Sequence, residues 1–147
     1  AIRSYREASR LDPRSAQKSN NLGLALAAAG KWDEALTSYE RAIQLVPHVA
    51  DYHLNLGTAL MGRGRLDDPI AECEAALRIN PAAPEVHNNL GIALLRLGRL
   101  DAGIDHFREA LRQAPGFAQA RQNLGNALVR QGKVAEAAQV LGTSAPR

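Results

Sequence analysis

The chain has 147 residues and a formal net charge of +3, with 18 Lys and Arg against 15 Asp and Glu. Alanine and leucine supply 27 and 20 residues, whereas aromatic residues make up only 4%, a composition that excludes an all-β fold and favours helices. The charges are interspersed rather than clustered, no apolar run approaches the roughly 20 residues of a membrane span, and a single cysteine excludes an internal disulfide.

These numbers lead us to expect no nucleic-acid partner and no membrane insertion. They leave the compartment open, with the cytoplasm only slightly favoured. One cysteine also excludes a cysteine-based zinc site.

A 34-residue period organises the chain from its first helix to its last. We predict a single array over residues 1–147: the second helix of a partial repeat at 1–15, complete repeats at 16–49, 50–83 and 84–117, and a truncated final repeat at 118–147. The register is marked by Leu-Gly pairs at Leu22-Gly23, Leu56-Gly57, Leu90-Gly91 and Leu124-Gly125.

Each complete repeat predicts two helices. In the first repeat, apolar residues at three- and four-residue spacing predict a helix over about 16–29, and Gly30 can end it in the left-handed conformation. Asp33 is expected to cap the next helix by accepting hydrogen bonds from its free amides, and Pro47 closes that helix. The glycine of each Leu-Gly pair costs about 1 kcal/mol inside a helix, so we expect it to permit close helix contact. The next repeats carry the same signals at Asp67 and Asp101 and at Pro81 and Pro115.

This pattern resembles the tetratricopeptide repeat. Its signature columns in the first complete repeat are Ser19, Leu22, Gly23, Leu26, Ala35, Tyr39, Ala42 and Pro47. The resemblance implies an all-α, right-handed solenoid of antiparallel helix hairpins, with the first helices lining a concave groove. The family's usual aromatic residue at the fourth column is absent, so we expect more polar or looser packing at Ser19, His53, His87 and Arg121.

Family geometry also implies which positions of each first helix face the groove. An asparagine recurs at the sixth position, and its amide can bond a peptide C=O and N–H at once. The predicted peptide-binding residues are Asn20, Asn21, Leu24, Leu54, Asn55, Thr58, Asn88, Asn89, Ile92, Arg96, Gln122, Asn123, Asn126 and Arg130.

The asparagine row is similar to the one in the repeat superhelix of O-linked N-acetylglucosamine transferase, which grips extended polypeptide. The alternative interpretation is that these asparagines bond neighbouring backbone and solvate the inner face. Arg96 and Arg130 favour an acidic group in the C-terminal half of the groove. The paired cations with which family members clamp a terminal carboxylate are missing from the matching columns.

Candidate chemistry is sparse, and we expect no catalytic residue, metal site or cofactor. His53 and His87 share a column, but no ligand cluster completes a metal site. Cys73 occupies the column of Tyr39 and Phe107 and is expected to be a buried apolar group. No phosphate-binding glycine loop or nucleophile motif appears.

Three functional hypotheses remain open at this point. The leading one is a protein-interaction scaffold that binds an extended peptide segment in its groove. The second is the repeat region of a larger enzyme, such as a glycosyltransferase. The third is self-assembly, in which copies stack through uncovered end helices to form a homo-oligomer.

Overall fold

The structure is a computed structural model that describes residues 1–65 and 68–142. Every regular element in these ranges is an α-helix, which confirms the all-α class predicted from composition. The helices are α1 (Ile2–Leu11), α2 (Ala16–Ala28), α3 (Trp32–Leu45), α4 (Ala50–Gly62), α5 (Asp68–Ile79), α6 (Pro84–Arg96), α7 (Leu100–Gln113), α8 (Ala118–Arg130) and α9 (Val134–Leu141). None of them is long and apolar enough to span a membrane.

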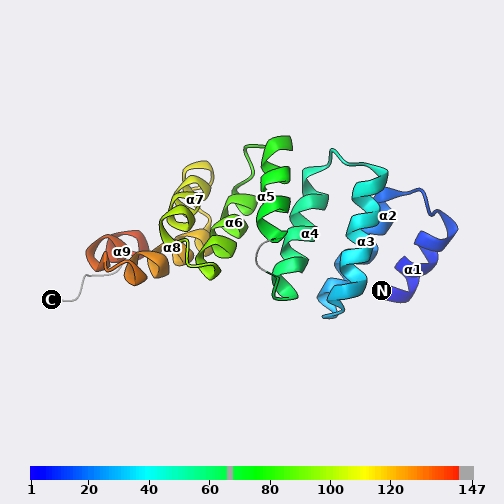
Figure 1. Cartoon of the computed structure of the whole chain (residues 1–147), viewed down its shortest axis with the longest axis horizontal. Helices are drawn as coiled ribbons and strands as arrows, with labels where there is room; N and C mark the ends of the chain where they lie inside the picture. Colours follow the sequence, from blue (N-terminus) through cyan, green and yellow to red (C-terminus); the bar gives the residue numbers. More distant parts are fainter. Residues whose placement is uncertain (66–67, 143–147) are drawn as a thin grey trace. The chain divides into compact units, whose positions relative to one another are not determined.

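The helices fall into two compact units, residues 1–81 with α1 to α5 and residues 82–147 with α6 to α9. Within the first unit, α2 pairs with α3 and α4 with α5, and in the second, α6 pairs with α7 and α8 with α9 (Figure 1). Each of these pairs is one predicted hairpin. Inside each unit, successive hairpins also contact through α3 and α4 and through α7 and α8, so packing is mostly between sequence neighbours, as in helical repeats.

The predicted helix ends are confirmed at the turn inside the first hairpin. Gly30 has φ of +72°, the left-handed conformation that glycine adopts without strain, and the Lys31 amide donates to the Leu26 carbonyl at 2.9 Å. α3 ends at Leu45, two residues before Pro47. The chain therefore turns back at the glycine and leaves the second helix before the proline.

The predicted aspartate caps are wrong. The residue that precedes α3 is Lys31, and its side chain makes no capping hydrogen bond. Asp33 lies one residue inside the helix, where its carboxylate accepts from Arg63 Nε at 2.8 Å instead of from the free amides. This aspartate therefore ties one hairpin to the next. The same arrangement recurs at Arg99, Asp101 and Gln131, and Asp67 lies outside the described residues.

The glycine of the Leu-Gly pair permits close helix contact, as predicted. A Cβ added at Gly91 would lie 2.6 Å from Phe107 Cε1, and one at Gly23 would lie 2.6 Å from Tyr39 Cε1. The second repeat differs because Cys73 replaces the aromatic ring. Cys73 is fully buried, as expected, and burial raises the pKa of its thiol to about 12.

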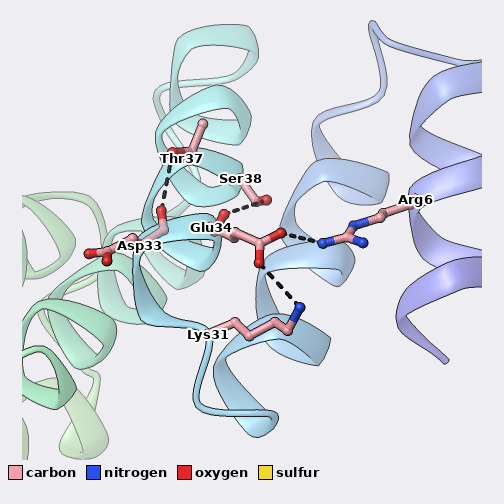
Figure 2. Close-up of polar contacts among 6 residues, drawn as sticks. All are labelled: Arg6, Lys31, Asp33, Glu34, Thr37 and Ser38. Carbon is pink, nitrogen blue, oxygen red and sulfur yellow. Dashed lines mark hydrogen bonds and ion pairs between the residues drawn. The ribbon is translucent and has the colours of Figure 1, made fainter.

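Ion pairs join consecutive second helices within each unit. In the first unit, Glu34 accepts from Arg6 of α1 and from Lys31 Nζ at 3.4 Å, while Ser38 Oγ donates to the Glu34 carbonyl at 2.9 Å (Figure 2). In the second unit, Arg108 of α7 pairs with Glu136 of α9 at 2.6 Å. These side chains are roughly half exposed, so each pair contributes little stability.

Candidate functional site

All the predicted groove residues lie on the first helices of the hairpins, α2, α4, α6 and α8. Their exposure differs, because the packing of successive hairpins covers some of them. Exposed positions are Leu24, Thr58, Arg96, Gln122, Asn126 and Arg130; half-buried positions are Asn21, Leu54, Asn55, Asn89, Ile92 and Asn123; and buried positions are Asn20 and Asn88.

Side-chain amides link consecutive first helices within each unit. Asn55 Nδ2 donates to Asn20 Oδ1 at 2.9 Å in the first unit, and Asn123 Nδ2 donates to Asn88 Oδ1 at 2.8 Å in the second. Each pair satisfies a buried oxygen that would otherwise be costly to leave unbonded. Two members of the asparagine row, Asn55 and Asn123, therefore have a structural role, because each donates to a side-chain oxygen of the preceding first helix.

The structure brings several predicted residues together around one hollow in the second unit. The hollow has a volume of about 250 Å³ and opens to solvent. Its walls come from α6, α7 and α8, and it is lined by Ile92, Leu95, Arg96, Phe107, Asn123, Asn126 and Arg130. Five of these seven residues are among the predicted groove residues, and the other two are Leu95 and Phe107.

A glycine makes room for the apolar floor of this hollow. Gly103, in the first turn of α7, is buried, and a Cβ at this position would overlap Leu95 Cδ1. Leu95 therefore packs closely against Gly103 of α7 and also lines the hollow. The corresponding residues of the other second helices are Ala35, Pro69 and Ala137. The contact between Leu95 and Gly103 depends on side-chain packing between α6 and α7, so it could not be predicted from the repeat pattern.

The polar wall of the hollow presents donors. Gln122 Nε2 donates to Asn126 Oδ1 at 3.1 Å, and Gln119 Nε2 donates to Asn123 Oδ1 at 3.3 Å, so both asparagine oxygens are already engaged. The Asn126 amide nitrogen has no hydrogen-bond acceptor in residues 1–65 or 68–142, and Arg130 has no ion pair there. Donors without acceptors make this wall complementary to a group that only accepts.

A larger hollow in the first unit, of about 450 Å³, lacks this property. It lies at the turns between helices and is lined by Gly30, Lys31, Trp32, Asp33, Glu34 and Arg63. Each of its charged side chains is already in an ion pair, as Figure 2 shows for Lys31 and Glu34. Its charges are therefore satisfied within the protein.

The two histidines of the fourth column bond within the fold. His53 Nδ1 lies 2.8 Å from Glu72 Oε2, and its Nε2 lies 3.0 Å from the Pro47 carbonyl. His87 Nδ1 faces His106 Nδ1 at 3.0 Å. With Ser19 buried in α2, this column is more polar than an aromatic one, as expected. In the part of the chain that the structure covers, no three His, Cys, Asp or Glu side chains gather around a metal-sized space.

Several solved structures have the same arrangement of helices as this chain, although their sequence identity to it is low. MamA from Desulfovibrio magneticus RS-1 is 23% identical with a TM-score of 0.87, covering 96% of this chain and 80% of its own. YrrB, a TPR protein with an unusual peptide-binding site, is 23% identical with a TM-score of 0.78, covering 96% and 73%. The first TPR of Spaghetti (RPAP3), bound to an HSP90 peptide, is 19% identical with a TM-score of 0.78, covering 82% and 96%.

A sequence comparison with curated proteins finds no match. The sequence pattern of the tetratricopeptide repeat, in contrast, matches residues 1–48, 20–84 and 88–142, which together span almost the whole chain. The matches, the helix hairpins and the structural neighbours agree with the resemblance drawn from the Leu-Gly register. The chain belongs to the tetratricopeptide repeat family and has its all-α solenoid fold.

Proposed function

We propose that this chain is a protein-interaction scaffold that binds an extended peptide segment on the first-helix face of its second unit. The observation that carries the proposal is the convergence of Ile92, Arg96, Asn123, Asn126 and Arg130 around one open hollow. The apolar floor provides contact area for side chains, and the amide and guanidinium groups provide hydrogen bonds to an extended segment.

The structural neighbours support peptide binding as the activity of this fold. The neighbour from Spaghetti holds an HSP90 peptide, and YrrB has a peptide-binding site. The fold hosts many partners, so the site has to be argued from its own residues. Asn126 is the best residue with which to test peptide binding without disturbing the fold. Its side chain is exposed, and its amide nitrogen has no acceptor within the described residues.

The test is a selection of random peptides displayed inside a carrier-protein loop, followed by affinity measurement on the folded chain. Asn126→Ala should raise the Kd of the selected peptides about fivefold, since one hydrogen bond contributes about 1 kcal/mol. Gln139→Ala is the matched control, because Gln139 is an exposed amide on α9. It should leave the Kd unchanged.

Two results would contradict the proposal. The first is a selection that yields no peptide binding to the folded chain. The second is a set of peptides whose affinity is the same for the wild type, Asn126→Ala and Gln139→Ala, because such peptides bind elsewhere.

A further inference from the structure

We infer that the hollow of the second unit takes an acidic side chain, Asp or Glu, from within the bound segment, with an aliphatic side chain next to it in the sequence. This inference rests on the proposed function and specifies the chemistry of its partner. Three features of the hollow carry it: its hydrogen-bond donors, its charge and its apolar floor.

The donors come from side chains whose oxygens are already occupied. Gln122 and Gln119 hold the oxygens of Asn126 and Asn123, so the amide N–H groups are what these asparagines still offer. One N–H of Asn123 is used by Asn88, which leaves Asn126 as the main amide donor. A carboxylate has acceptor sites only, so it satisfies such a wall without leaving a donor of its own unpaired.

Positive charge at this column is confined to the second unit. The thirteenth position of the first helix is Arg96 in α6 and Arg130 in α8, whereas it is Ala28 and Gly62 at the matching places of the first unit. Arg130 is exposed and has no ion pair with any described residue. Charge complementarity therefore selects an anionic group here, and hydrogen bonds between guanidinium and carboxylate are among the stronger ones in proteins.

The floor of the hollow fits an aliphatic neighbour of that acid. Ile92, Leu95 and Phe107 line the hollow together, and the absence of a side chain at Gly103 leaves room for Leu95 to pack against α7. In an extended segment, successive side chains point in opposite directions, so the acid and the aliphatic residue reach different walls. Because the hollow opens to solvent, the segment can continue past it, and we assign the carboxylate to a side chain rather than to a chain end.

The experiment uses peptides from the same internal selection, synthesised with acetylated and amidated ends so that no terminal charge contributes. The selected sequences should be enriched in Asp or Glu next to Leu, Ile, Val or Met. Replacing the enriched Glu by Gln should weaken binding to the wild type about tenfold. The same replacement should have little effect on binding to Arg130→Gln. Lys133→Gln removes an equal charge outside the hollow, so with this variant the Glu-to-Gln difference should persist.

A second measurement does not depend on any variant. Raising the salt concentration from about 50 mM to about 500 mM should lower the affinity of the Glu peptide more than that of the Gln peptide, because salt screens the interaction between charges. Equal affinity of Glu and Gln peptides, or selected peptides that bind through Asn126 without any acid, would overturn the inference and leave the proposed function standing. Binding that requires a free carboxyl terminus would also overturn it. Failure to select any peptide would instead contradict the proposed function.

Discussion

Replacing Gly91 by alanine will destabilise the protein, whereas the same replacement at Gly57 will stabilise it slightly. Both glycines occupy the Leu-Gly column inside a first helix, where alanine is favoured by about 1 kcal/mol through helix propensity. The two positions differ in the residue that faces them from the second helix. Gly91 faces the fully buried ring of Phe107, and Gly57 faces Cys73.

The magnitudes follow from the space at each glycine. At Gly91 a Cβ would lie 2.6, 2.8 and 2.9 Å from three ring atoms of Phe107, so the ring must move. Overpacking of this kind costs about 1–3 kcal/mol, which outweighs the propensity gain and leaves a net loss of up to about 2 kcal/mol. At Gly57 the nearest atoms lie at 3.4 Å, ordinary contact distance, so most of the gain of about 1 kcal/mol remains.

The assay is urea unfolding followed by far-ultraviolet circular dichroism, with both variants compared with the wild type. We expect the urea concentration at the unfolding midpoint to be lower than in the wild type for Gly91→Ala and higher for Gly57→Ala. Phe107→Leu provides the check on mechanism: it shortens the facing side chain, so Gly91→Ala should cost less in that background than in the wild type. Equal shifts for the two glycine variants would refute the packing argument, as would a cost at Gly91 that is unchanged by Phe107→Leu.

Three further predictions concern single groups. Cys73 should react with a thiol reagent far more slowly in the folded chain than in urea, because its pKa of about 12 alone lowers the thiolate fraction at about pH 8 roughly a thousandfold; similar rates in both states would be inconsistent with its burial. Glu109, held by its hydrogen bond from Arg112, should titrate by NMR with a pKa of about 2, so its favourable interaction is present above the ordinary carboxylate range and is lost as the pH falls towards 2; Arg112→Gln should raise that pKa, and no rise would exclude the arginine as its cause. Gly103→Ala should push Leu95 into the hollow and weaken selected peptides without changing any charge, and unchanged affinity would show that the open floor is not used.

The repeat pattern was sufficient to predict most of the fold. The Leu-Gly register, the glycine at the end of each first helix and the proline after α1, α3, α5 and α7 are local signals, so they were enough to predict the helix hairpins. The buried Cys73 could also be predicted, because its column holds an aromatic ring in the repeats on either side.

Features that depend on distant contacts could not be predicted in the same way. Asp33 is a good capping residue by type, but α3 begins one residue before it, so its carboxylate reaches Arg63 of the next hairpin. The Asn55–Asn20 bond joins residues 35 positions apart, and nothing in the repeat pattern indicates that these two side chains pair with each other.

The candidate site was predicted in part. The column positions identified the polar wall of the hollow, because all four of its polar residues lie on the first helices. The floor depends on Leu95 leaning over Gly103 and on the edge of Phe107, which is set by packing between α6 and α7. Peptide contact by these residues stays a prediction.

Whether a peptide binds the first-helix face of the second unit is best measured by amide chemical-shift mapping. A selected peptide should be titrated into isotope-labelled protein. The largest shifts should fall on the amide groups of Ile92, Asn123 and Asn126, with smaller shifts on exposed residues of α9. Largest shifts on α9, or on the ion-paired residues Arg108 and Arg112 of α7, would contradict binding at this face.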